Sequence, residues 1–304
     1  MPGSRAMSTR RDRVLGWHWI PTDPLEVAMR ELFDTLNFRF DAELGPPDED
    51  LGKTSTLLSI AKRRSHRRFK PEPPSLDLLK MLSAVALSAP SKSDLQARDI
   101  VIVTDAEKRR RIATEVVGQA WLENAPVILV FLGNNKRQRH IHEWRDKPFE
   151  NDHLDAFFNP AVDAGIAMQA FIDAAESIGL GCCPVSGIRN NCPLVNDLLD
   201  LPAHVFPVVG LGVGWPSQEG HISVRLPLEA TVHVDTFDDA NIEAQVTAYD
   251  DRRYAIHHPD TQRQEGRFGR AEKYTWSEDK ARQYASPERA DFGAYIRAKG
   301  FNLE

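Results

Sequence analysis

The chain carries a run of arginines around one serine, RRSHRRF at residues 63–69. Guanidinium groups bind phosphate oxygens through paired N–H donors, and a serine hydroxyl adds another donor. An exposed ion-pair cluster uses the same residue types, so the run by itself is compatible with a phosphate site and with a charged surface. Other segments of the chain must therefore decide whether the run is a phosphate site or a charged surface.

Two other segments have side chains suited to the same kind of ligand. The loop PSKSDLQ, residues 90–96, concentrates short hydroxyl and amide groups that can bind a phosphate or the polar edge of a ring. Arg225, in SVRLP, lies between an expected loop and an expected strand and could complete a phosphate site. Residues 159–181 are apolar or small nearly all round, which predicts a buried helix suited to a flat aromatic cofactor or a subunit interface.

Other chemical signatures are weak. Gly210, Gly212 and Gly214 lie inside an expected strand and not in a turn between a strand and a helix. They indicate close backbone packing and argue against a dinucleotide-binding turn. His140 and His142 have no third ligand at a useful spacing, so we predict no metal site.

Composition is that of an ordinary globular protein. The 304 residues are 41% hydrophobic and 27% charged, and the net charge of −6 argues against a general nucleic-acid binder. The sequence has no apolar run approaching the roughly 20 residues of a membrane helix, and its N-terminus lacks the apolar stretch of a secretory signal. Three cysteines, Cys182, Cys183 and Cys192, indicate reduced thiols because the number is odd and two are adjacent. We expect a cytoplasmic protein with no nucleic-acid and no membrane partner.

Capping residues and periodicity predict an α+β domain. Ser75 is placed to cap a helix over 76–89, and Asp105 ends a strand over 99–105 and caps a helix over 106–125. Asn159 and Pro160 mark the start of the helix over 159–181. Few strands among many helices indicate a small mixed sheet wrapped by helices. Further helices are expected over 23–40, 57–65, 193–201, 239–254, 276–285 and 288–299, strands over 126–134 and 205–216, a long loop or lid over 135–158, and irregular chain over 1–22 and 45–53.

Five segments, in the right order, resemble the FMN-dependent nitroreductase family. The stretch from RRSHRRF to DIVIVTD is similar to the family's opening, with its R-S-x-R-x-F run, a helix and a P-S-x-x-N-x-Q loop. AVDAGIAMQAFIDAAESIGLGCCPVSGIRNN resembles the central helix and following strand, and LLDLPAHVFPVVGLGVGWP resembles the segment that closes the sheet. RLPLEATVHVDTF and the C-terminal segment resemble the NADPH-preferring branch. The resemblance covers residues 57–304, so residues 1–56 are expected to be an extension with one amphipathic helix and no assigned role.

The resemblance implies an intertwined homodimer with one FMN in each active site at the interface. The arginine run and Arg225 would hold the ribityl phosphate and the pyrimidine edge. Ser91 would touch the flavin, Gln96 would orient its loop, and residues 184–187 would present a backbone N–H to flavin N5. The FMN-binding residues implied in this way are Arg63, Arg64, Ser65, Arg67, Ser91, Gln96, Gln119, Pro184, Val185, Ser186, Gly187 and Arg225.

The same resemblance points to the second substrate and to three departures from the family pattern. Candidates for the 2′-phosphate of NADPH are Arg267, Arg270 and Lys273. Asp94 replaces a common Asn, and a carboxylate there would lower the flavin potential. Pro184 and Ser186 replace an aromatic residue and a glycine, which would reshape the acceptor pocket.

The implied activity is an oxidoreductase reaction by a ping-pong mechanism. Hydride passes from NADPH, with NADH as a possible donor, to FMN and then to a nitroaromatic, a quinone or free flavin. Alternatives on the same fold are a reductase that supplies flavin to a monooxygenase, an oxidative flavoenzyme, and a non-catalytic flavin sensor. Outside the family, an interaction protein with a basic patch remains an alternative. The sequence does not identify the physiological acceptor.

Overall fold

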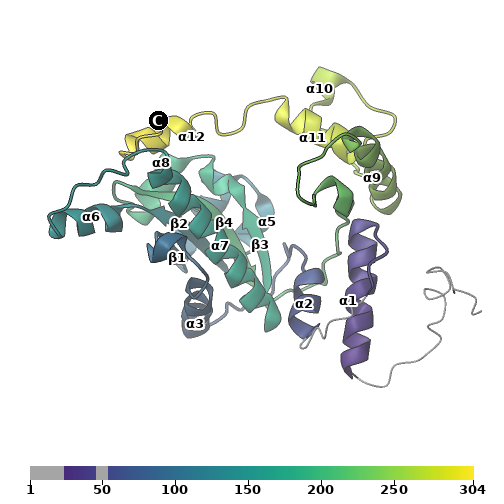
Figure 1. Cartoon of the computed structure of the whole chain (residues 1–304), viewed down its shortest axis with the longest axis horizontal. Helices are drawn as coiled ribbons and strands as arrows, with labels where there is room; N and C mark the ends of the chain where they lie inside the picture. Colours follow the sequence, from purple (N-terminus) through teal and green to yellow (C-terminus); the bar gives the residue numbers. More distant parts are fainter. Residues whose placement is uncertain (1–23, 46–53) are drawn as a thin grey trace, which may run out of the picture.

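The computed structural model describes residues 24–45 and 54–304. The irregular segment expected over residues 1–22 and most of the break at 45–53 lie outside the described residues. In Figure 1, a sheet and the helices around it form one body, and a second group of helices lies beside the β3 edge of that sheet.

The sheet has four strands, and all pairs among the described strands are antiparallel. The expectation of a mixed sheet is therefore wrong for this chain, although the α+β class is confirmed. The order is β1-β2-β4-β3, where the strands are β1 (Arg98–Val103), β2 (Val127–Asn134), β3 (Gly181–Val185) and β4 (Val205–Gly214). Strand β2 is buried along almost its whole length, which explains why its sequence is continuously apolar.

The two faces of the sheet are covered by different helices because side chains alternate along each strand. Val127, Leu129 and Phe131 pack against α3 (Leu76–Leu87) and α7 (Asp155–Ser177). Ile128 and Val130 face the opposite way, toward residues 112–125 and α8 (Cys192–Leu199). Small residues allow close packing on β4. A Cβ on Gly214 would lie 2.6 Å from Pro126 Cγ.

The long helix expected over 106–125 is interrupted. Asp105 caps α4 (Ala106–Arg111) by accepting a hydrogen bond from Lys108 N, as predicted. A π-helical turn, Ile112–Val117, then leads to Gly118, whose φ of 66° lies in the left-handed region. A shorter helix, α5 (Ala120–Glu123), follows. The left-handed glycine ends the helix and turns the chain before residues 119–123.

The segment expected as a loop or lid over 135–158 is largely helical. Helix α6 (Lys136–Trp144) occupies its first part, and α7 begins at Asp155, so Asn159 is not its cap and Pro160 lies inside the helix. Aromatic packing accounts for this earlier start. Phe157 lies 4.9 Å from Phe206, between ring centroids, in a cluster with Phe301. This contact outweighs the usual preference of proline for the first helical position.

The second group of helices combines α1 with helices from the C-terminal part of the chain. Helix α1 (Pro24–Phe40) packs on α2 (Thr54–Ala61), and α9 (Ile242–Ile256) contacts the end of α1. Two short helices, α10 (Glu265–Phe268) and α11 (Trp276–Tyr284), lie beside α9 (Figure 1), and α12 (Phe292–Ala298) returns to the main body near α8. Among residues 24–45 and 54–304, no helix combines the length and apolar character needed to cross a membrane.

Candidate anion-binding site

The arginine run is extended. The helix expected over 57–65 ends at Ala61 in the structure. From there the chain runs beside β3 and the end of β4, and hydrogen bonds hold it there: His66 N donates to Cys182 O at 3.0 Å, and Lys70 N donates to Trp215 O at 2.7 Å. Like charges three and four residues apart would repel on a helix. In an extended segment, alternate residues instead point to opposite sides.

One side of the run carries Arg63, Ser65 and Arg67, which we call the odd face. Ser65 and Arg67 lie within hydrogen-bonding reach of the Cys183 thiol, whose pKa is raised by burial and only partly offset by these neighbours. The Arg67 guanidinium lies 6.0 Å from the ring centre of Trp121. Trp121 Nε1 in turn donates to Gln119 Oε1 at 2.7 Å, so Gln119 and Arg67 approach the same indole.

Residues 184–187 form the end of β3 and the start of the turn that follows it. Val185 belongs to the cluster that contains Val117, and a Cβ on Gly187 would lie 3.0 Å from a methyl group of Val117. The turn before Gln119 therefore packs directly on the segment that the resemblance assigns to the flavin ring. The structure brings the odd face, Gln119 and residues 184–187 into one region.

Arg39 of α1 contacts both Arg225 and the beginning of the run. The sequence alone did not indicate a role for this residue. Arg39 is 7% exposed. Burial, followed by the charges of Arg225 and Arg63, lowers its pKa to about 10. The three charges therefore lie close enough to act on one another, although Arg225 is exposed and its Nη1 donates to Ser223 Oγ at 2.7 Å. No sequence motif marks Arg39, because it contacts the run only through the packing of α1.

An acid beside this cluster is Glu176, in the last turn of α7. Its Oε1 lies 3.9 Å from Arg63 Nε, and its side chain is 11% exposed. Burial raises the pKa of Glu176 to about 7, with Arg63 opposing the rise and Asp173 adding to it. Within the described residues, Nε of Arg39 and Nε and Nη2 of Arg63 are buried without a hydrogen-bond partner. Buried donors without acceptors are uncommon, so the cluster is suited to an anionic ligand.

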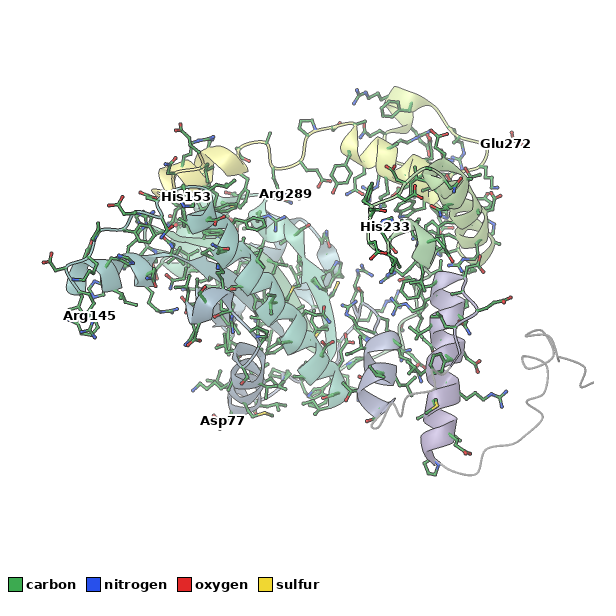
Figure 2. All side chains as sticks on the ribbon, in the orientation of Figure 1. Asp77, Arg145, His153, His233, Glu272 and Arg289 are labelled. Carbon is green, nitrogen blue, oxygen red and sulfur yellow. The ribbon has the colours of Figure 1, made fainter. Side chains whose placement is uncertain are left out.

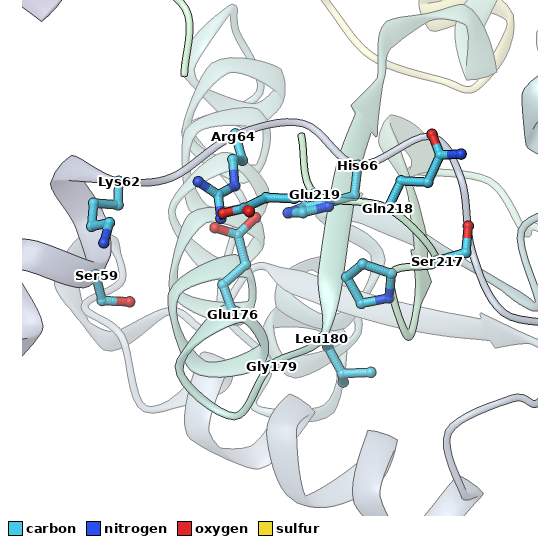
Figure 3. Close-up of a pocket in the computed structure, with 11 residues that line it drawn as sticks. Ser59, Lys62, Arg64, His66, Glu176, Gly179, Leu180, Ser217, Gln218 and Glu219 are labelled. Atoms are coloured by element: carbon cyan, nitrogen blue, oxygen red, sulfur yellow. The ribbon is translucent and has the colours of Figure 1, made fainter. Parts of the chain in front are cut away.

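The other side of the run, with Arg64, His66 and Arg68, is the even face. Arg64 Nη2 pairs with Glu219 at 2.6 Å, and Arg68 Nη1 donates to Gln218 Oε1 at 2.8 Å. Arg64 and His66 line a cavity of about 490 Å³, into which Glu176 also projects (Figure 3). Burial lowers the pKa of His66, and the charges of Arg64 and Arg63 add to this effect. Arg64 thus lines this cavity and shares Glu176 as a neighbour with Arg63, and its contact with FMN stays a prediction.

Ser91 and Gln96 lie on the far side of the sheet. Their loop precedes β1, which is separated from β3 by three strand spacings, or roughly 14 Å. Ser91 Oγ accepts a hydrogen bond from Gln96 N at 3.1 Å, and the buried Asp163 accepts one from Lys92 N at 3.0 Å. Asp94 and Gln96 have φ values of 56° and 50°. Such left-handed conformations in residues other than glycine are costly and often accompany function.

The three NADPH candidates are exposed, and each has a protein partner. Arg267 Nη1 donates to Ala285 O at 2.7 Å, Arg270 lies 3.6 Å from Glu265, and Lys273 Nζ lies 2.5 Å from Asp251. Glu272, next to Lys273, lies at the outer edge of the second helical group in Figure 2.

The remaining sequence predictions about chemistry concern metals and thiols. In the part of the chain that the structure describes, no group of three potential metal ligands comes together. His140 and His142 lie two positions apart on α6, so they do not share a face. Cys182, Cys183 and Cys192 are free and buried, as expected for reduced structural thiols. Burial raises the pKa of Cys182 and brings that of Cys192 to about 11.

Known families and proteins match most of this chain. Residues 60–215 match the Nitroreductase family, and residues 223–304 match the Nitroreductase family, C-terminal domain. An FMN reductase [NAD(P)H] of Bacillus subtilis is 30% identical over 251 residues, covering 82% of this chain and 98% of the relative. A Vibrio harveyi NADPH-flavin oxidoreductase is 31% identical over 246 residues, covering 81% and 98%.

A solved structure, that of B. megaterium NfrA2, has a TM-score of 0.74 and 32% identity over 82% of this chain and 99% of that chain. The structure of the NADPH:FMN oxidoreductase from Vibrio harveyi, complexed with NAD+, has a TM-score of 0.71 and 30% identity, covering 81% and 98%. The fold and the extent of these matches lead to one conclusion: the chain belongs to the nitroreductase family, in its branch of NADPH-flavin oxidoreductases.

Proposed function

We propose that this chain binds FMN and uses NADPH to reduce a nitroaromatic, a quinone or free flavin, alternating between donor and acceptor in a ping-pong cycle. The observation that carries the proposal is the pair of neighbouring arginines, Arg39 and Arg63, whose buried donors find no acceptor among the described residues. Only a strong anion balances such a group, and a phosphate monoester carries up to two negative charges.

The residues of this region suit the different parts of FMN. Arg63 and Arg225 would hold the phosphate, because both lie close to the buried Arg39 and, among the described residues, Arg63 pairs only with Glu176, at 3.9 Å. Ser65 and Arg67 would bind the polar edge of the ring, and Gln119 would approach it from the other side of Trp121. When bound, FMN supplies the hydride chemistry, while the protein supplies orientation and electrostatics.

We further propose that the site is completed by a second copy of this chain. Ser91 and Gln96 lie across the sheet from the odd face, so the loop that carries them would reach the flavin of a partner. Helix α7 exposes Phe158, Val162 and Ile166 at helical spacing. Met81 and Val85 on the neighbouring α3 are also exposed. A contiguous apolar surface of this kind is typical of a homodimer interface.

The donor assignment rests on the exposed basic residues Arg267, Arg270 and Lys273, which could bind the 2′-phosphate of NADPH after exchanging their present partners. The acceptor would be a small molecule, with neither nucleic acid nor membrane as a partner. We place the protein in the cytoplasm, where three buried thiols stay reduced.

Flavin content and its response to NADPH test the proposal. Arg67→Ala and Arg225→Ala should each weaken FMN binding by at least about 10-fold, because each removes a charged hydrogen-bond donor. Arg110→Ala, which removes an exposed arginine paired with Glu107, is the matched control. The ratio of absorbance at the flavin band to that of the protein, measured on folded variants, gives the occupancy.

Anaerobic addition of NADPH to the wild type should bleach the flavin band. Full flavin occupancy in both site variants would refute the assignment of the site. A flavin that stays oxidised with NADPH and NADH would instead support the non-catalytic sensor, and a wild type that takes up no FMN would refute the proposed function.

A further inference from the structure

Arg39 connects α1 to the arginine run. It lies at the C-terminal end of α1, before the family match that begins at residue 60. Its Nη1 donates to Ala61 O at 2.6 Å and lies 3.4 Å from Arg63 O. The buried side chain therefore reaches from the N-terminal helix to the point where α2 ends and the odd face begins.

The backbone of Arg39 connects α1 to the second arginine segment as well. Its carbonyl oxygen accepts a hydrogen bond from Arg225 N at 2.6 Å and another from Arg252 Nη2 at 2.9 Å. Arg252 also donates to Arg225 O at 3.0 Å and pairs with Asp41 at 3.4 Å. The last turn of α1 is thus fixed to both segments that supply the phosphate-binding arginines.

Among residues 24–45 and 54–304, the charge of this cluster meets a single carboxylate, that of Glu176. Arg39 lies close enough to Arg63 and Arg225 for their charges to lower its pKa. Its Nε has no acceptor among the described residues, and the same holds for Nε and Nη2 of Arg63. Glu176 is 3.9 Å from Arg63 and, with a pKa of about 7, is only partly ionised at neutral pH. Removing one partner from a buried ionic group is costly, so an uncompensated cluster of cations is expected to bind an anion.

We propose that Arg39 is a third phosphate-binding arginine, supplied to the FMN site by the N-terminal helix that precedes the family match. The inference rests on the proposed function, since it identifies the anion as the 5′-phosphate of FMN. Arg39 would strengthen binding of the phosphate and leave recognition of the ring to Ser65, Arg67 and residues 184–187.

Comparison of FMN with riboflavin tests this role, because riboflavin has the same ring and side chain but no phosphate. The full-length protein is freed of flavin, and the dissociation constants of both ligands are measured by flavin fluorescence. Arg39→Met keeps most of the apolar volume and removes the charge. We expect this substitution to weaken the binding of FMN about 10- to 100-fold, as for loss of a charged hydrogen bond. The binding of riboflavin should weaken less than about 2-fold. Arg30→Met is the control, since Arg30 is exposed on the same helix and pairs with Asp34.

Each outcome has a distinct meaning. Equal weakening of FMN and riboflavin would overturn the proposal, because it would show that Arg39 only supports the local structure. No change in FMN binding would overturn it too. If Arg39→Met does not fold, Arg39→Lys decides by the same comparison, because it keeps the charge without the planar fork and should weaken FMN selectively. A wild type that binds neither ligand would refute the proposed function itself, whatever the variants do.

Discussion

Glu176 makes a quantitative prediction about the pH dependence of stability. Its carboxyl group lies at the end of α7, 11% exposed, with Arg63 too far away at 3.9 Å for a full hydrogen bond. Burial raises its pKa from 4.5 to about 7. In the unfolded chain the group ionises near its usual pKa, so between about pH 4.5 and pH 7 the folded protein binds more protons than the unfolded protein. The free energy of unfolding must then fall as pH rises through this window.

The magnitude follows from the two pKa values. The difference between the pKa values of Glu176 in the folded and unfolded protein corresponds to about 3 kcal/mol of free energy of unfolding. Because Glu176 borders a cavity that solvent enters, we expect screening to reduce the effect to about 1–2 kcal/mol. Glu176→Gln replaces the carboxyl group with a neutral group of the same size. It should therefore be about as stable as the wild type near pH 5 and about 1–2 kcal/mol more stable at pH 8.

Urea unfolding followed by tryptophan fluorescence at pH 5 and pH 8 measures this difference. Glu272→Gln serves as the control because Glu272 is exposed at the outer edge of the second helical group (Figure 2), and it should match the wild type at both pH values. A variant that is less stable than the wild type at pH 8 would refute the reasoning. That result would mean that Glu176 is ionised and that its ion pair with Arg63 outweighs the cost of burial.

Three further predictions concern the interface, the sheet and the loop. Val162→Glu should give a monomer that has lost FMN, as measured by sedimentation and flavin absorbance, while Val232→Glu, an exposed valine away from α7, should change neither. Gly214→Ala should lower the free energy of unfolding by about 1–3 kcal/mol, because its Cβ would overlap Pro126, whereas Gly45→Ala meets no atom within 4 Å and should be neutral in urea unfolding. Asp94→Asn should raise the flavin midpoint potential by about 30 mV in a redox titration, because it removes a negative charge, and an unchanged potential would place Asp94 away from the flavin.

Local chemistry was sufficient to predict several elements. Ser75 accepts the hydrogen bond from Leu78 N that its position before α3 predicts, and Asp105 does the same for α4. Both caps depend on residues three positions apart, so the sequence contains the whole interaction. The continuous apolar run of β2 likewise predicts a strand buried on both faces, which the structure confirms.

Features that depend on distant contacts were not predictable in this way. The start of α7 was misplaced because Phe157 packs on Phe206 and Phe301, far along the chain. Arg39 was missed because its partners are Arg63 and Arg225, and nothing in its own helix marks it. The P-S motif identified Ser91 as a candidate, but a motif does not reveal that its loop lies across the sheet from the arginine run.

The alternation along residues 63–68 gives one short segment two surfaces, which meet at Glu176. Substitutions at positions 64 and 66 can change the size and charge of the cavity in Figure 3, while Ser65 and Arg67 keep the Cys183 thiol as their neighbour. An insertion of a single residue would exchange the two surfaces, because side chains in extended chain repeat every two residues. Point substitutions at positions 64 and 66 can therefore remodel the cavity while Ser65 and Arg67 stay in place, whereas a change in the length of this segment would move both surfaces.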